Sequence, residues 1–280
     1  MSYFQPASLG EALEILGEED LRVVAGCTDF FPSQPMGGQC RAILDLTRVA
    51  GLRGIDETAE GWRIGATTTW TDVIRAPLPP AFDALKLAAR EVGSVQIQNL
   101  GTLAGNICNA SPAADGVPPL LALEAAIEVA SAGGTRRMPL SRFITHVRAT
   151  DLGPGEMVTA LHIPRRAAAG TSAFLKLGSR KYMVISIAMV AANIRVEDGH
   201  IADLRVAVGS CSPVAMRLTE LETALTGQRI DRIGAMPDAW FAALGPLSDV
   251  RGSSAYRLAS VAELCARTIH TAATAKAEPC

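Results

Sequence analysis

The stretch GTLAGNICNASPAAD, residues 101–115, is the part of the sequence that decides the fold. It contains two glycines, two asparagines, two hydroxyl side chains and one carboxylate, and it lies between a helix-like segment and an apolar one. A plain surface turn seldom needs so many residues without bulk. Gly101 and Gly105 allow a close approach to the main chain. The pattern therefore favours a loop that lies against a ligand.

A second glycine-marked loop, VVAGCTDF, occupies residues 23–30 and follows a strand that the pattern of residues 21–26 predicts to be buried. We expect Gly26 to take a positive φ and to expose the main chain to a ligand. Thr28 offers a hydroxyl and Asp29 an acceptor. Successive amides in such loops form concave nests that bind anions, above all phosphate oxygens.

Polar but uncharged groups fill the longer stretch: Thr102, Asn106, Asn109 and Ser111. Asp115 is an acceptor suited to sugar or ribityl hydroxyls. Neither loop contains a lysine, and neither matches the phosphate-binding signature of nucleotidases or the glycine pattern of dinucleotide-binding dehydrogenases. These two classes are therefore poor readings of the chain.

The composition of the chain argues against several further classes of protein. The chain has 280 residues, of which 49% are hydrophobic and 19% charged, with a net charge of −2. This is enough apolar side chain for a core, and no run of Lys and Arg suggests nucleic acid or an anionic membrane as a partner. No apolar stretch approaches the ~20 residues that span a bilayer. The N-terminal stretch lacks a basic start and an apolar signal core, so we expect a cytoplasmic protein.

Hydrophobic periodicity predicts an α+β protein with two domains, residues 1–168 and 169–280. The first mixes strands and helices. The second offers strands and then helices, which favours an antiparallel sheet with helices on one face. Predicted helices cover residues 7–16, 67–74, 81–92, the start of 117–131, 215–227 and 253–275, and predicted strands cover 21–26, 40–46, 61–66, the end of 117–131, 156–164, 172–178, 185–199 and 201–210.

The sequence offers no candidate metal ligands and no candidate residue for a covalent cofactor link. The six cysteines lie too far apart for the spacing of a zinc or iron–sulfur site, and we predict no metal site in this chain. The four histidines lie outside both loops, so we expect them to be structural. No side chain stands out as a catalytic acid or base.

Four segments in order resemble one family of enzymes. They are VVAGCTDF (23–30), IGATTTWTDV (64–73), QIQNLGTLAGNICNASPAAD (96–115) and KLGSRKYMVISIAMVAA (176–192). Together they resemble the FAD-binding, or medium, subunit of the xanthine dehydrogenase and carbon monoxide dehydrogenase family of molybdenum hydroxylases. The resemblance covers most of the chain. The last ~60 residues fit by length and helix content only.

The resemblance implies a two-lobed FAD-binding domain of the p-cresol methylhydroxylase and vanillyl-alcohol oxidase type, followed by a CO dehydrogenase flavoprotein C-terminal domain. It places the first pyrophosphate loop on Ala25, Gly26, Cys27, Thr28 and Asp29, and the second on Thr102, Leu103, Ala104, Gly105 and Asn106. Asn109 and Asp115 match positions that contact FAD, Lys176 matches a lysine near the flavin, and Ile187 matches a residue against the isoalloxazine ring. Cys27 departs from the family, which usually has a second glycine there.

The resemblance also implies a function and partners. FAD is expected to be bound without a covalent link, and molybdopterin and [2Fe–2S] clusters are expected on a large and a small partner subunit only. Electrons would pass from those clusters through FAD to an external acceptor such as NAD⁺ or a quinone. Two other functions stay open: a self-sufficient flavin oxidoreductase with its own substrate pocket, and an interaction subunit that has kept the fold without the cofactor.

Overall fold

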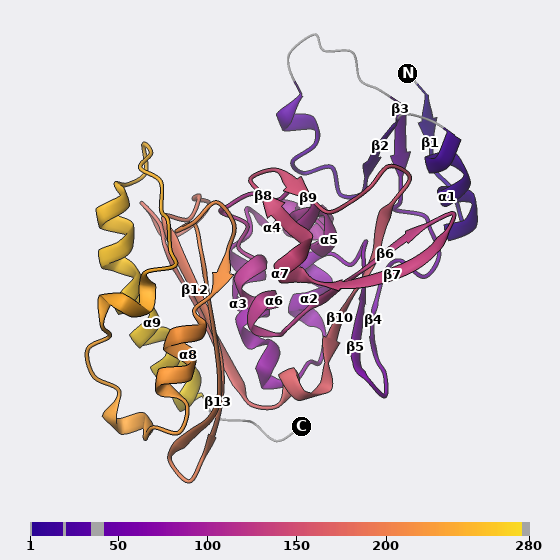
Figure 1. Ribbon diagram of the computed structural model, residues 1–280. Helices are drawn as coiled ribbons and strands as arrows, with labels where there is room; N and C mark the ends of the chain where they lie inside the picture. The colour runs from indigo at the N-terminus through magenta and orange to yellow at the C-terminus, as the bar shows by residue number, and fades with distance from the viewer. Residues whose placement is uncertain (1, 19–20, 35–41, 276–280) are drawn as a thin grey trace.

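A small parallel sheet forms the first lobe of the protein (Figure 1). The computed structural model describes residues 2–18, 21–34 and 42–275. In the sheet order β1-β3-β2, strand β3 lies between β1 and β2, and helix α1 begins after Ser8, whose Oγ accepts a hydrogen bond from Glu11 N. These elements are β1 (Tyr3–Phe4), α1 (Leu9–Glu18), β2 (Leu21–Val24) and β3 (Ala42–Asp45).

The burial expected for the strand at residues 21–26 was wrong. Strand β2 is an edge strand of its sheet, and Val23 is 40% exposed, whereas Val24 is buried. An apolar run cannot reveal by itself how many neighbours a strand will have. The loop at residues 23–30 therefore leaves the edge of the first lobe.

A five-stranded antiparallel sheet forms the second lobe, in the order β4-β5-β10-β6-β7. Short helices pack on it around a core that includes Trp70, Phe82 and Leu120. The strands are β4 (Ile55–Glu57), β5 (Gly61–Gly65), β6 (Ala126–Ser131), β7 (Gly134–Pro139) and β10 (Met157–Pro164), with a separate pair β8 (Ile144–His146) and β9 (Ala149–Thr150). The helices are α2 (Trp70–Arg75), α3 (Asp83–Glu91), α4 (Val95–Leu100), α5 (Leu103–Cys108), α6 (Val117–Ala122) and α7 (Leu140–Phe143).

Threonine capping explains two of these helices. Thr69 caps α2, and Asp72 completes the capping box. Thr102 caps α5 by accepting a hydrogen bond from Gly105 N at 3.1 Å. The stretch 101–115 is therefore not one open loop, because it begins with a short capped helix.

The C-terminal part is built on an antiparallel sheet in the order β11-β12-β13-β14. Asp198 and Gly199 both have positive φ and form the hairpin turn between the two long strands of this sheet. The elements are β11 (Thr171–Leu177), β12 (Ala188–Glu197), β13 (His200–Gly209), β14 (Met216–Arg217), α8 (Thr219–Leu225) and α9 (Ser254–Thr274). Short 3-10 helices occupy Phe31–Ser33, Pro80–Phe82, Arg165–Ala168, Ile230–Arg232 and Asp238–Phe241.

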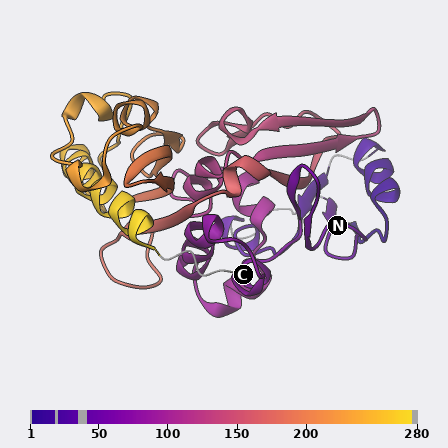
Figure 2. The same cartoon turned by 90° about the horizontal axis from the view of Figure 1, so that it is seen from below.

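Helices cover both faces of this sheet, rather than the single face expected (Figure 1). Its own helices α8 and α9 cover one face. The other face packs on α3 and α6 of the N-terminal part, where Ala88 and Ala122 meet Phe174 and Met189. Strand β12 is consequently buried at every position from Ala188 to Ile194. Figure 2 shows α9 at one end of the molecule and the first lobe at the other.

The lengths and compositions of the helices show whether any of them could cross a membrane. In the described ranges, no helix has both the length and the apolar character that crossing a bilayer requires.

Candidate functional site

The two glycine-marked loops are in direct contact. A Cβ atom built on Gly26 would lie 1.8 Å from the Leu100 carbonyl oxygen and 3.0 Å from Gly101 Cα. From the other loop, a Cβ atom on Gly101 would lie 3.4 Å from Thr28 Oγ1. Glycine at position 26 therefore lets two main-chain segments touch that are far apart in the sequence.

The positive φ expected at Gly26 was wrong. The next residue, Cys27, takes that conformation instead. Gly26 does not have a positive φ, whereas Cys27 has φ 57°. The left-handed conformation costs an ordinary residue about 1–2 kcal/mol. This is the position where the family usually has a second glycine. Burial and the nearby Asp45 carboxylate raise the pKa of the Cys27 thiol.

Free backbone amides line both loops. Among the described residues, no acceptor takes the amide protons of Cys27, Thr28, Asp29 or Ala104. Leu103 N donates to Thr68 O at 3.0 Å, which fixes the second loop to the end of the adjacent strand. Amides with this arrangement suit the oxygens of a phosphate or diphosphate group.

The residues of the two predicted pyrophosphate loops differ in exposure. Leu103 and Ala104 are buried in the core, so they offer only their main chain to a ligand. Gly105 and Asp29 are exposed, and Thr102 is buried as the helix cap. The remaining loop residues, Ala25, Gly26, Cys27, Thr28 and Asn106, are half-buried.

The two asparagines have different environments. Asn106 Oδ1 is buried and has no hydrogen-bond partner among the described residues. It is therefore available to a hydroxyl of a ligand. The Asn109 side chain and carbonyl both accept hydrogen bonds from Arg148, whose own amide donates to Ala110 O at 2.9 Å. No sequence pattern pointed to Arg148, which reaches the stretch 101–115 only through the fold.

Asp115 and Lys176 form a buried ion pair. Lys176 Nζ lies 2.7 Å from Asp115 Oδ2, and Ser186 Oγ donates to Asp115 Oδ1 at 2.5 Å. Burial raises the pKa of Asp115, although Lys176 and the Ser186 hydroxyl favour its ionised form. Lys176 is on an edge strand, but its side chain is only 6% exposed, so it is not a solvated surface cation. Each carboxylate oxygen keeps a further acceptor position for a ligand hydroxyl.

Ile187 lies beside this pair, and both its backbone amide and its backbone carbonyl form hydrogen bonds within the protein. Its amide donates to Leu177 O at 2.8 Å, and its carbonyl accepts from Arg257 Nη1. The residue is 5% exposed. Only its side chain is therefore available to a ligand.

Backbone strain concentrates around these segments. Seven non-glycine residues in the described ranges have a positive φ, and five of them lie in the site segments or bond to them. Such strain tends to persist where the surroundings enforce it, often at functional sites. The five residues are Cys27, Ala110, Arg148, Met183 and Ser210.

Two aromatic side chains from the segments that resemble the family, and one histidine, lie outside the two loops. Trp70 is 1% exposed and belongs to the core, whereas Tyr182 is 62% exposed. His162 Nε2 lies 2.8 Å from Glu128 Oε2 in the second lobe. Within the described parts of the chain, no group of three or more His, Cys, Asp or Glu residues is arranged to hold a metal ion.

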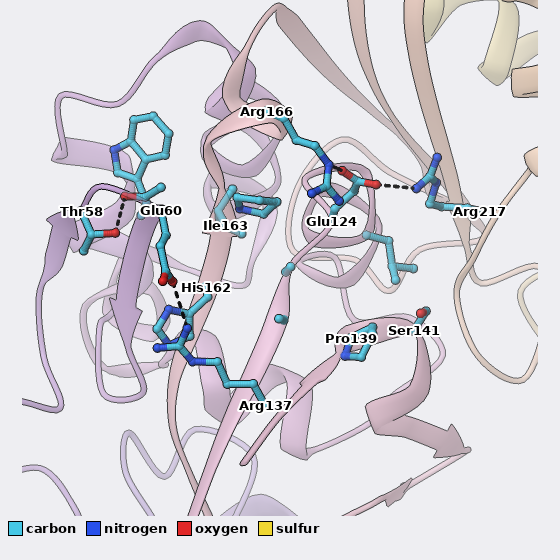
Figure 3. A pocket seen from close by; sticks show the side chains of 16 residues that line it. Thr58, Glu60, Glu124, Arg137, Pro139, Ser141, His162, Ile163, Arg166 and Arg217 are labelled. Atoms are coloured by element: carbon cyan, nitrogen blue, oxygen red, sulfur yellow. Dashed lines mark hydrogen bonds and ion pairs between the residues drawn. The ribbon is translucent and has the colours of Figure 1, made fainter. Parts of the chain in front are cut away.

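A cavity of about 440 Å³ lies apart from the two loops (Figure 3). At its edge, Glu124 accepts from Arg166 at 3.1 Å and pairs with Arg217 of the C-terminal sheet at 3.5 Å. None of the predicted site residues lines it. We therefore place the candidate site at the loops, where free amides and an unpartnered amide oxygen converge, and not in this cavity.

The residues present fit FAD. The free amides of the two loops suit its diphosphate, and Asn106 Oδ1 and the Asp115 carboxylate are acceptors for its hydroxyls. The apolar Ile187 side chain suits a ring face.

Comparisons with known proteins agree with this fit. The model of the FAD binding domain in molybdopterin dehydrogenase matches residues 1–166, and that of the CO dehydrogenase flavoprotein C-terminal domain matches residues 173–272. The xanthine dehydrogenase FAD-binding subunit of Escherichia coli O157:H7 is 30% identical, with 98% of this chain and 96% of that protein covered. The glyceraldehyde dehydrogenase medium chain of Sulfolobus acidocaldarius is 31% identical, with 91% and 92% covered.

A solved structure shares the whole fold. It is a carbon monoxide dehydrogenase from Hydrogenophaga pseudoflava that lacks the Mo-pyranopterin moiety of its cofactor. The similarity has a TM-score of 0.88 and 28% identity, and covers 97% of this chain and 96% of that one. The two contacting loops and the domain that follows them thus have a common explanation: the chain belongs to the family with the FAD-binding domain of molybdopterin dehydrogenases, joined to a CO dehydrogenase flavoprotein C-terminal domain.

Proposed function

We propose that this chain is the FAD-binding electron-transfer subunit of a molybdenum hydroxylase complex. It receives electrons from iron–sulfur clusters on a small partner subunit, which in turn receives them from a molybdopterin-binding large subunit. It passes them to an external acceptor, NAD⁺ or a quinone. The complex works in the cytoplasm, in keeping with the four described cysteines, Cys27, Cys108, Cys211 and Cys265, which are free thiols.

One observation carries this proposal: Gly26 lies against the main chain of Leu100 and Gly101. The contact brings the free amides at Cys27 and Thr28 beside the capped turn that begins at Thr102. Two nests on one edge match the two phosphates of a dinucleotide. A single loop would not account for both.

Each part of the site has a defined task in this function. The free amides of the two loops, those of Cys27, Thr28, Asp29 and Ala104, hold the diphosphate of FAD. Asn106, Asn109 and Asp115 bind its hydroxyls, and the Lys176 ammonium beside Asp115 favours the ionised form of that carboxylate. Ile187 covers part of the ring and excludes water from it. When bound, FAD supplies both one-electron and two-electron chemistry.

We also propose that the FAD-binding domain ends at residue 168 and that the second domain spans residues 169–280. Residue 168 ends the 3-10 helix Arg165–Ala168, and β11 begins at Thr171. The two parts share the Asp115–Lys176 pair, so the site needs both.

Absorption spectroscopy of the purified complex tests the function. We expect flavin bands near ~370 and ~450 nm, and release of all the flavin by acid precipitation. Reduction by substrate, followed by addition of NAD⁺ or of a quinone, identifies the acceptor. A complex with intact iron–sulfur clusters that releases no flavin on acid precipitation would contradict the proposal. Flavin reduction by substrate in the isolated chain would instead favour a self-sufficient oxidoreductase.

A further inference from the structure

Arg257 is a buried cation to which the candidate site assigns no role. It lies one turn into helix α9, and it is 4% exposed. A buried guanidinium is costly unless its donors are used, and a cation near a helix N-terminus also opposes the helix dipole. Its position therefore calls for a compensating set of partners.

Those partners lie on three separate segments. Nη1 donates to the Ile187 carbonyl and to Ser210 O at 2.9 Å, and Nη2 donates to Asp249 Oδ1 at 2.7 Å. A guanidinium can hold all three at once because its donors form a rigid fork. A lysine ammonium also has three donors, but all of them are on one nitrogen, so it cannot reproduce the separate positions of Nη1 and Nη2.

Two of these contacts converge on Ile187. One holds its carbonyl directly. The other holds Asp249, which forms a tight turn with Gly252 through backbone hydrogen bonds of 3.1 and 3.2 Å. A Cβ atom on Gly252 would lie 3.4 Å from Ile187 Cγ2. Arg257 therefore fixes Ile187 at its main chain and, through the turn, at its side chain.

The third contact reaches the stretch 101–115. Ser210 has φ 62°, and its amide donates to Pro112 O at 3.0 Å while its carbonyl accepts from Arg257. Pro112 lies three residues before Asp115. The same guanidinium thus ties Ile187 to the loop that carries the buried carboxylate.

We infer that Arg257 is a positioning residue for the flavin ring: it clamps Ile187 against the ring and couples α9 to the stretch 101–115. The inference rests on the proposed FAD function. Arg257 acts through Ile187 and has no direct role with the cofactor. Loosening the clamp admits water beside the ring, which changes the flavin's environment without removing any group that binds its diphosphate.

The test compares Arg257→Lys with Arg251→Lys in the full chain within the purified complex. Arg251 is the matched control, because its Nη1 bonds the other oxygen of Asp249 at 3.0 Å but its side chain is 37% exposed. The first measurement is hydrogen exchange at the Ile187 amide, which needs no flavin. The second is the visible circular dichroism and midpoint potential of bound FAD.

We expect Arg257→Lys to speed exchange at Ile187 by roughly tenfold, and to shift the flavin dichroism and potential while FAD content stays normal. Arg251→Lys should change neither. Asp249→Asn keeps Arg257 but weakens its bond to the turn that packs on Ile187. It should also shift the flavin signals, which covers the case in which Arg257→Lys does not fold.

Three results would overturn the inference. Unchanged hydrogen exchange at the Ile187 amide in Arg257→Lys would show that Arg257 does not hold Ile187 in place. Faster exchange with unchanged flavin signals makes Arg257 a purely structural residue. A wild-type complex without flavin refutes the proposed function, and with it the flavin role of Arg257, while the exchange measurement still decides whether the clamp exists.

Discussion

Lys176 Nζ lies 2.7 Å from Asp115 Oδ2, and this pair joins the two matched domains of the chain. The side chains are 6% and 9% exposed, respectively. At such burial the two charges depend on each other, because an unpaired charge away from water is strongly unfavourable. The site is therefore complete only when the C-terminal sheet is docked on the FAD-binding domain.

Removing Asp115 should destabilise the protein more than a surface substitution does. Asp115→Ala leaves Lys176 buried without its partner, so we expect a loss of about 3–5 kcal/mol of unfolding free energy. The double variant Asp115→Ala with Lys176→Met should recover part of that loss, because no unpaired charge remains. Urea unfolding followed by circular dichroism measures both.

An exposed helical pair provides the comparison for this experiment. Arg267 and Glu263 have side chains that are 68% and 62% exposed. Glu263→Ala should change stability by less than about 0.5 kcal/mol. Equal effects of Asp115→Ala and Glu263→Ala would show that the buried pair has no special importance.

A side chain at position 26 should separate the two loops. The Cβ of Gly26→Ala would lie 1.8 Å from the Leu100 carbonyl oxygen, so one main chain must move. We expect loss of FAD retention on gel filtration. Gly17→Ala is the control, because its Cβ meets nothing within 4 Å and alanine favours helix α1. Normal flavin content in Gly26→Ala would rule out the contact as the basis of binding.

Cys27 should tolerate glycine well. With φ 57°, the position is in the left-handed region, so Cys27→Gly relieves strain, and the entropy of glycine offsets part of the gain. We expect a net stabilisation of up to about 1 kcal/mol, and a loss for Cys27→Val, whose branched side chain fits this region poorly. Thermal unfolding distinguishes the two variants. A lower Tm for Cys27→Gly than for Cys27→Val would show that the positive φ at Cys27 does not strain the backbone.

Glu156 should make stability depend on pH in acid. Bidentate bonds from Arg136 and the Gly153 amide lower its pKa from 4.5 to about 2. The folded state thus favours the ionised carboxylate, so its contribution is present above pH ~4.5 and disappears as the pH falls towards 2. The stability difference between wild type and Glu156→Gln should shrink over that range. A difference independent of pH would contradict the pairing, and Arg136→Leu should reduce the dependence to the part that the Gly153 amide supplies.

Local patterns in the sequence predicted much of the fold correctly. The Thr69 cap, the turn at Asp198 and Gly199 and the long helix α9 follow from residues close together in the chain. Capping, turn conformation and periodicity are local properties, so a single sequence contains them. The exposed edge of β2 and the second covered face of the C-terminal sheet were missed, because burial depends on distant partners.

The candidate site shows the same division. The sequence by itself determined which segments form the candidate site, since glycines, asparagines and one carboxylate in fixed order are readable without coordinates. Only the tertiary structure decided that Gly26 is needed for close packing, that Cys27 takes the left-handed conformation, and that Asp115, Lys176 and Arg257 meet around Ile187. The reason is physical: contacts between distant segments follow from how whole layers pack, and no local preference encodes them.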